Sequence, residues 1–343
     1  MAGGRAAGYG VCWESEVNRR DIVVIGASAG GLDAVRALLV PVEAGFPAAF
    51  FFVTHLAPGP SRLDEVLAAD ISLEVRFAKH GEAIRPGTLL IAPPDRHLIL
   101  ERERVVLTRG PRENLWRPSI DVLFRCAAVA FASRVIGIVL SGALDDGSSG
   151  LRAVEQCGGL CMVQSPADAP HPHMPESALR AVSDARVMTA MEMGAALPAL
   201  AAATAPPAAP IPEQVRLEAS VAAGDEEATR EIEARGEPTN LNCPECGGPL
   251  NRQPGNLLRF RCRLGHAFAA ASLGEASRGA VESSLWAAIR LLEQRANVDR
   301  ARGKVERDRG RAAAAAAYGE RAAEVTGHAD VLREILAKLP APS

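Results

Sequence analysis

Two polar residues that directly follow apolar runs near the start of the chain could carry out nucleophilic catalysis. Ser28 lies in the glycine-rich turn Gly26–Gly31, directly after the apolar run Ile22–Ile25. Glycines allow a sharp strand-to-helix turn, which lifts a serine hydroxyl out of the sheet and aims free helix amides at a developing oxyanion. His55 follows a second apolar run, Ala49–Val53, and could accept the serine proton. The spacing predicts Ser28 as nucleophile and His55 as its base, although a lone histidine is also common as a structural residue.

An acidic pair could complete this site. The apolar run Val135–Leu140 leads into a loop that contains Asp145 and Asp146. A carboxylate hydrogen-bonded to an imidazole fixes its tautomer and stabilises the imidazolium that forms during attack. Either aspartate could instead only cap the helix expected from Ser148. Because the carboxyl ends of parallel strands meet at one edge of a sheet, the three segments together favour the catalytic interpretation.

Late in the chain, cysteines and a histidine have the spacing of a metal site. Cys243 and Cys246 form a Cys-x2-Cys pair, and Cys262 and His266 follow as Cys-x3-His. This pattern is typical of a zinc ribbon, in which four protein ligands close a tetrahedral structural site. The ion would then supply folding energy to a module too small for a core of its own. The alternative is three free cysteines and a surface histidine.

The elements that must position these residues follow from the apolar pattern. Short apolar runs alternate with amphipathic segments from Asp21 to Leu200, which predicts a three-layer α/β fold with a mostly parallel, doubly wound sheet. The expected strands are 22–25, 49–53, 75–78, 88–92, 135–140 and 160–164, with a small edge hairpin at 98–100 and 105–107. The expected helices are 32–39, 61–67, 120–131 and 148–157.

Composition limits the classes of protein. The chain has 343 residues, 48% of them hydrophobic, and a net charge of -3, which gives no general field for nucleic acid or anionic membranes. The basic run Arg295–Arg311 is interleaved with acids and indicates a solvated helix face. The seven cysteines do not form a disulfide framework, and no segment has the pattern of a signal peptide or membrane span. We therefore expect a cytoplasmic protein.

Changes in composition divide the chain into five parts. The expected parts are a flexible leader at 1–20, a catalytic domain at 21–200, a linker at 201–240, a zinc-ribbon module at 241–270 and a helical tail at 271–343. The linker is rich in alanine, proline and charge, which leaves room for one short helix or strand. In the tail, apolar residues around Trp286 recur at helical spacing and predict a packing stripe, and Gly319 or Gly327 is expected to interrupt the helix.

The ordered motifs resemble a known family. The segments Gly26–Gly31, Thr54–Pro58 and Leu140–Gly147 are similar to the three catalytic segments of the CheB-type chemotaxis protein-glutamate methylesterases. Two further signatures stand in the order of the family, at Ile91–Pro94 and Arg117–Phe124. The resemblance covers about residues 21 to 200. Each motif alone is weak evidence for the family, but all of them in this order are specific for it.

The resemblance implies roles for individual residues. Ser28 would be the nucleophile, His55 the general base and acid, and Asp146 rather than Asp145 the orienting acid. The family hydrolyses glutamyl methyl esters on chemoreceptors and deamidates receptor glutamines, without a catalytic cofactor. Three positions depart from the family pattern: Ala29, Ala143–Leu144 and Trp116. These departures leave the triad intact but affect substrate preference and the oxyanion environment.

The resemblance also bears on regulation. About twenty residues precede the first catalytic strand, so we expect no phosphorylatable receiver domain. The enzyme would then be constitutively available, controlled by its own C-terminal extension, or controlled by a regulatory protein that binds the helical tail. The expected substrate partner is a methylated chemoreceptor or a related signalling protein.

Three rival interpretations use the same residues differently. A dinucleotide-binding loop would need an acid after the second strand, whereas Val53 leads to Thr54 and His55. An ordinary α/β-hydrolase places its acid before its histidine, the reverse of the order here. A non-catalytic scaffold with the zinc ribbon and helical tail as an interaction module is disfavoured because all three triad residue types are present.

Overall fold

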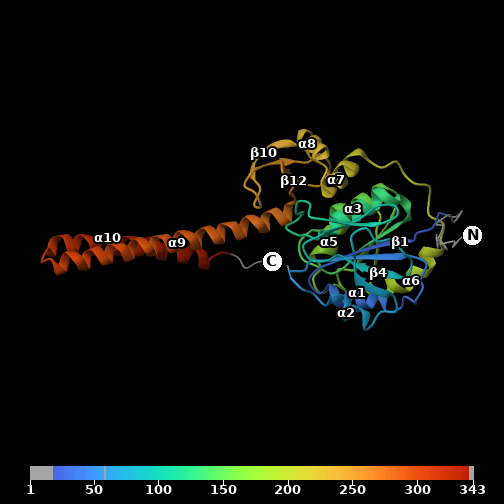
Figure 1. Ribbon diagram of the computed structural model, residues 1–343, viewed down its shortest axis with the longest axis horizontal. Helices are drawn as coiled ribbons and strands as arrows, with labels where there is room; N and C mark the ends of the chain where they lie inside the picture. Colours follow the sequence, from blue (N-terminus) through green and yellow to red (C-terminus); the bar gives the residue numbers. More distant parts are fainter. Residues whose placement is uncertain (1–17, 58, 340–343) are drawn as a thin grey trace, which may run out of the picture.

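A seven-stranded parallel sheet forms the centre of the protein (Figure 1). The computed structural model describes residues 18–57 and 59–339, so the expected leader lies almost entirely outside the described residues. Every pairing between neighbouring strands of this sheet is parallel, in the order β3-β4-β2-β1-β7-β8-β9. The strands are β1 (Ile22–Ala27), β2 (Ala49–Thr54), β3 (Glu74–Phe77), β4 (Thr88–Ile91), β7 (Val135–Val139), β8 (Leu160–Gln164) and β9 (Arg186–Met188). The fold class expected from the sequence is confirmed.

Helices cover both faces of the sheet because the central strands are apolar on both sides. In β1, Ile22 and Val24 belong to one buried cluster, whereas Val23 and Ile25 belong to the other. The helices of the first layer are α3 (Ile120–Phe131), α4 (Ser148–Gln156) and α5 (His173–Ala181), and those of the second are α1 (Gly31–Leu39), α2 (Leu63–Ala68) and α6 (Ala190–Ala202). Helices α5 and α6 and strand β9 were not expected from the sequence.

The strand order places the candidate residues at one edge of the sheet. Strand β1 lies between β2 and β7, with Ala27 opposite Thr54 and Gly26 opposite Val139. The residues that follow these three strands therefore emerge side by side at their carboxyl ends. This is the edge at which Ser28, His55 and the acidic loop were expected to meet.

The predicted hairpin forms, but not at the edge of the main sheet. Strands β5 (His97–Leu100) and β6 (Val105–Thr108) pair antiparallel as a separate two-stranded sheet. Ile99 is buried against Val122 and Cys126 of α3, and the Val105 main chain exchanges hydrogen bonds with Gly81 and Glu82, so both contacts hold the hairpin in place.

The segment expected to be a linker carries two helices, α7 (Glu213–Ala223) and α8 (Glu226–Ala234). Helix α7 packs on α3, and its Val215 joins the buried cluster between the seven-stranded sheet and its first layer of helices. Asp225 caps α8 by accepting hydrogen bonds from the amides of Glu227 and Ala228. The alanine- and proline-rich stretch 203–212 contains no helix, whereas the rest of the expected linker folds into α7, which packs on α3, and α8, which packs on α7.

A second, four-stranded antiparallel sheet follows. Its strands are β10 (Glu237–Asn242), β11 (Pro249–Arg252), β12 (Arg259–Cys262) and β13 (Ala267–Ala269). Helix α9 (Ala270–Asp308) starts directly after β13 and extends away from the body of the protein, and α10 (Ala312–Ala337) returns along it (Figure 1).

The helical tail is interrupted at a different glycine from the two expected. Gly310 has a φ of 74° and lies just past α9, whereas Gly319 and Gly327 lie within α10. The amides of Gly310 and Arg311 donate to the carbonyls of Arg307 and Glu306, which satisfies the helix end with a left-handed glycine. Within residues 18–57 and 59–339, no helix combines the length and apolar character that a membrane span requires.

Candidate active site

The turn after β1 holds Ser28 by hydrogen bonds of the main chain. The amide of Ser28 donates to the carbonyl of Ser141 at 2.9 Å, and the carbonyl of Ser28 accepts from Gly31 at 2.9 Å. Gly30 has a φ of 69°, a left-handed conformation that favours glycine. A Cβ at Gly142 would lie 3.0 Å from the Ser28 Cβ and still closer to Met174, so only glycine lets the two loops approach. The turn thereby fixes the position of the Ser28 side chain.

Ser28, His55 and Asp146 form a continuous chain of hydrogen bonds. Ser28 Oγ lies 2.9 Å from His55 Nδ1, and His55 Nε2 lies 2.8 Å from Asp146 Oδ2. The side chains of His55 and Asp146 are 4% and 1% exposed, whereas Ser28 is half-buried. An ionised carboxylate can only accept, so Nε2 carries the imidazole proton and the Nδ1 lone pair faces the serine hydroxyl. This geometry suits a serine whose proton passes to histidine.

The carboxylate of Asp146 is held by donors from one segment of the chain. It accepts hydrogen bonds from Ser119 Oγ at 2.9 Å, from the Ile120 amide at 2.8 Å, and from Asn114 Nδ2 at 2.9 Å. Burial opposes ionisation, but the hydrogen bonds from His55, Asn114 and Ile120 outweigh it and hold the pKa of Asp146 below its usual value. Asp146 therefore remains an anion that orients His55.

A second buried carboxyl, Asp121, lies beside Asp146. Burial, followed by the negative charge of Asp146, raises the pKa of Asp121 to about 7. Asp121 accepts from the Gly150 amide and from Asn114 Nδ2. Asn114 thus donates to both carboxyl groups.

Trp116 lies flat against the imidazole of His55. The two ring centroids are 4.3 Å apart and the planes differ by 3°. An aromatic face attracts a cation above it, so the indole stabilises the imidazolium that forms when histidine accepts a proton. The sequence showed Trp116 only as a departure from the family pattern, and the fold reveals this contact.

Comparisons with known proteins show to which family the chain belongs. A profile of the family described as CheB methylesterase matches residues 23–197. The chain belongs to the CheB methylesterase family. A relative from Leptospira interrogans is 36% identical over 167 residues, which span 48% of this chain and 86% of the relative. Protein-glutamate methylesterase/protein-glutamine glutaminase 2 of Anaeromyxobacter dehalogenans is 37% identical over 180 residues, spanning 52% of this chain and 53% of that protein.

A solved structure supports the same assignment. The crystal structure of the Thermotoga maritima CheB methylesterase catalytic domain matches with a TM-score of 0.50 and 30% sequence identity, covering 52% of this chain and 98% of that chain. The CheB match ends at residue 197, so α7, the small sheet and the helical hairpin lie beyond it.

The structure separates the two neighbouring aspartates in the loop after β7. Asp146 faces His55, whereas Asp145 accepts hydrogen bonds from the Ala271 amide at 3.0 Å and from Ser272 Oγ at the start of α9. Neither aspartate caps α4 with its side chain. The position before Gly147, which the CheB resemblance implied, is the one that reaches the imidazole.

Two amides in the turn after β1 and the loop after β7 are free to bind a developing oxyanion. Within the described part of the chain, the amides of Ala29 and Ala143 donate to no other protein group. The Ser28 and Gly142 amides are already used, by the carbonyls of Ser141 and His171. The two alanines that depart from the CheB pattern thus still present their backbone donors.

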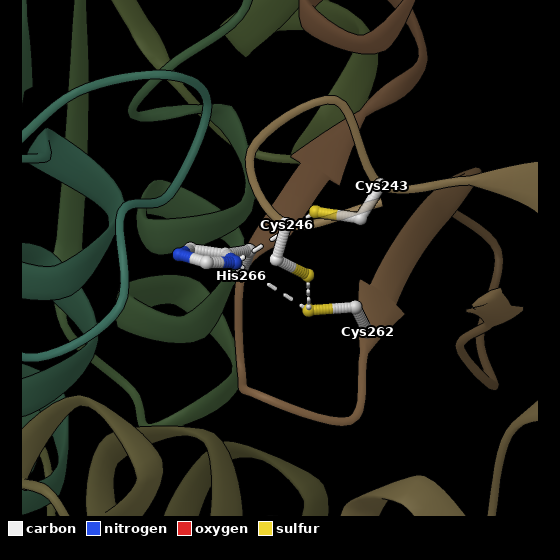
Figure 2. A group of neighbouring side chains, drawn as sticks. All are labelled: Cys243, Cys246, Cys262 and His266. Carbon is white, nitrogen blue, oxygen red and sulfur yellow. Dashed lines mark hydrogen bonds between the residues drawn. The ribbon is translucent and has the colours of Figure 1, made fainter. Parts of the chain in front are cut away.

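The expected metal ligands converge at the end of the small sheet (Figure 2). The ligand atoms of Cys243, Cys246, Cys262 and His266 all lie within 4.8 Å of one another. The Sγ atoms of Cys246 and Cys262 are 3.7 Å apart, and His266 Nδ1 is 3.5 Å from Cys262 Sγ. A tetrahedral Zn²⁺ with ordinary bond lengths would separate its ligand atoms by about 3.5–3.8 Å. The four side chains therefore fit a closed zinc site.

Five buried charged residues connect the small sheet to the catalytic domain. Arg125 of α3 forms salt bridges with Glu113 at 2.9 Å and with Glu218 of α7 at 3.2 Å. Arg259 and Arg261 of β12 bond to the same two glutamates. The cluster joins charged residues from distant segments of the chain. The local sequence around each of these residues does not predict that they meet in a buried cluster. None of these five residues was predicted from the sequence to form a buried ion cluster.

The buried ion cluster predicts a loss of stability in acid. Burial would raise the pKa of Glu218, but the charges of Arg259, Arg125 and Arg261 outweigh it and lower that pKa from 4.5 to about 2. A depressed pKa contributes stability above the unfolded value, which is lost as pH falls toward the folded value. The free energy of unfolding should therefore fall by about 3 kcal/mol from this group as pH drops from about 4.5 to about 2.

The variant Glu218→Gln separates this group from the other acids. Near neutral pH the free energy of unfolding of the variant should be about 3–5 kcal/mol lower than that of wild type, because buried arginine charges lose a partner. Urea unfolding of both proteins across the acid range should show this difference shrinking as pH approaches about 2. A difference that stays constant with pH would contradict the coupling.

Proposed function

We propose that this protein hydrolyses glutamyl methyl esters on chemoreceptors or related signalling proteins. The observation that carries the proposal is the unbroken chain from Ser28 through His55 to Asp146 at the edge of a CheB-family sheet. The relatives are named for esterase and glutaminase activities, and both reactions are acyl transfers that one such site can perform. In this proposal, residues 21–200 form the catalytic domain and the protein acts on receptors in the cytoplasm.

The reaction proceeds through an acyl-enzyme. Ser28 Oγ attacks the ester carbonyl while His55 Nδ1 accepts the hydroxyl proton. The tetrahedral intermediate collapses, the C–O bond to the methoxy group breaks, and the imidazolium returns its proton to release methanol. Water then attacks the acyl-enzyme and gives a proton to His55. When the second intermediate collapses, the bond from the acyl carbon to Ser28 Oγ breaks, the imidazolium returns the proton to Oγ, and glutamate is released. A glutamine substrate would follow the same path and release ammonia.

Asp146, Ala29 and Ala143 support these steps. Asp146 keeps the proton on His55 Nε2 and stabilises the imidazolium after each transfer. The free amides of Ala29 and Ala143 are the donors for the oxyanion. Backbone donors do not depend on the side chain, so the alanines at these positions are compatible with the reaction.

Product analysis tests the proposed reaction. A receptor cytoplasmic fragment carrying glutamyl methyl esters is incubated with the full chain, and methanol and newly formed glutamate are quantified. We expect the two products in equal amounts, above a control without enzyme. The same fragment with glutamine at the modified positions tests deamidation through ammonia release. Failure to release methanol from any ester would overturn the proposed function and favour a non-catalytic scaffold.

We propose that Cys243, Cys246, Cys262 and His266 hold a structural Zn²⁺ in a module that spans residues 241–270. Four protein ligands leave no open coordination position, so the ion stabilises the fold of the module and takes no part in the reaction. Metal analysis of protein purified under reducing conditions should find one zinc per chain, and Cys246→Ser should lose most of it. The control Cys157→Ser changes a buried cysteine of the catalytic domain and should keep the zinc. Zinc-free wild-type protein with a folded module would refute this site.

A further inference from the structure

Asn114 connects the acid of the catalytic site to the C-terminal module. Its Nδ2 donates to Asp146 Oδ1 and to Asp121 Oδ2, each at 2.9 Å, and its Oδ1 accepts from the Ala269 amide at 2.8 Å. Only this orientation of the amide satisfies two carboxylate acceptors and one backbone donor. Asn114 is 2% exposed, so water cannot replace these partners.

The conformation of Asn114 depends on strand β13. The Asn114 amide donates to the Ala267 carbonyl at 2.8 Å, and the Ala267 amide donates to the Arg112 carbonyl at 3.2 Å. These two hydrogen bonds form an isolated parallel bridge between Glu113 and Ala267, which ties residues 112–114 to β13. Asn114 has a φ of 51°, a left-handed conformation that asparagine tolerates but that needs such support.

The start of α9 holds Asp145, the residue next to Asp146 in the sequence. Its carboxylate accepts hydrogen bonds from the Ala271 amide and the Ser272 hydroxyl, in the first turn of α9. Asp145 is 8% exposed and Ser272 is 1% exposed, so this contact is buried. Residues 267–272, which we call the clamp, therefore contact both Asn114 and Asp145, which lie next to Asp146.

The clamp begins directly after a ligand of the proposed metal site. His266 immediately precedes β13, and its carbonyl accepts from the Cys262 amide at 3.0 Å. A closed metal site would therefore fix the start of the clamp. The matched CheB region ends at residue 197, so the clamp lies beyond it, whereas Asn114 and Asp145 lie within it.

We propose that Asn114 and Asp145 are positioning residues, held by the clamp, that aim Asp146 at His55, so that the C-terminal module completes the active site. The inference rests on the proposed function for its kinetic consequences. The hydrogen bond from His55 to Asp146, however, exists without substrate and can be measured separately. Loading of the metal site then determines how well the acid is oriented.

Kinetics of three full-length variants test the positioning. Asn114→Ala should lower kcat about 10- to 100-fold with little change in KM, because the lost donor served a buried charge and does not touch substrate. Ser272→Ala should lower kcat several-fold in the same way. Asn251→Ala is the matched control: it removes a half-buried asparagine of the module, whose side chain has no hydrogen-bond partner in the described chain, and should match wild type.

Nuclear magnetic resonance of ¹⁵N-histidine-labelled protein gives a readout independent of turnover. The His55 Nε2–H resonance, assigned by its loss in His55→Gln, should lie downfield in wild type and Asn251→Ala. It should shift or broaden in Asn114→Ala, in Ser272→Ala and in wild type stripped of metal by a chelator. If circular dichroism shows that Ser272→Ala folds but Asn114→Ala does not, the His55 resonance of Ser272→Ala and of metal-stripped wild type tests the positioning role.

The outcomes separate this inference from the proposed function. Unchanged His55 resonance and unchanged kcat in Ser272→Ala and in metal-stripped protein would overturn the positioning role while leaving esterase activity intact. A resonance that responds to these changes in a protein that releases no methanol would support the positioning and overturn only the proposed function.

Discussion

We expect the replacement of Ser28 with alanine to remove nearly all of the proposed ester hydrolysis, with kcat lower by about 10⁶-fold. The variant keeps the fold, because the hydrogen bonds that hold this turn come from the Ser28 main chain. Without Oγ there is no atom for His55 to activate, and only binding and oxyanion stabilisation remain. The measurement is methanol release from a methylated receptor fragment under saturating substrate.

Ser183→Ala is the control for this substitution. Ser183 is exposed and its hydroxyl donates to Glu155, away from His55. Its activity should equal that of wild type. If Ser28→Ala and Ser183→Ala both retained the wild-type rate, Ser28 would not be the nucleophile.

Asp146→Asn should be nearly as damaging, with kcat lower by about 10⁴-fold and the fold retained. An asparagine at this position presents an amide to His55 and to the donors of Ser119, Ile120 and Asn114, so the imidazole is held in the wrong tautomer. Steady-state kinetics with the receptor fragment measure the loss, and circular dichroism checks the fold.

Asp145→Asn distinguishes the two neighbouring acids. This side chain contacts Ala271 and Ser272 rather than His55, so its replacement acts only through the position of Asp146. We expect a loss of about tenfold or less. A greater loss in Asp145→Asn than in Asp146→Asn would contradict the assignment of the orienting acid.

The sequence could predict the central sheet and the convergence of the three rim segments because both follow from local patterns. Apolar runs mark the parallel strands, and the carboxyl ends of β1, β2 and β7 necessarily share one edge once these strands are neighbours. The spacing of Cys243, Cys246, Cys262 and His266 likewise carried the cluster seen in the structure. In each case the signal lies within a few consecutive residues.

Contacts between distant segments could not be predicted in the same way. Nothing in the local sequence of Asn114 indicates that its amide spans from Asp146 to Ala269. The segment 201–240 was expected to be a linker because its composition is alanine- and proline-rich, yet α7 packs into the domain through Val215 and the buried Glu218. Such roles depend on tertiary packing, which overrides local propensity.

Partitioning of the acyl-enzyme between water and hydroxylamine tests whether Ser28 carries the acyl group. Methylated receptor fragment is incubated with wild type in the presence of hydroxylamine, which competes with water for an acyl group on Ser28. We expect glutamyl hydroxamate together with glutamate from wild type, and only the slow uncatalysed background from Ser28→Ala. Methanol release by wild type with hydroxamate no higher than in Ser28→Ala would contradict an acyl-enzyme on Ser28.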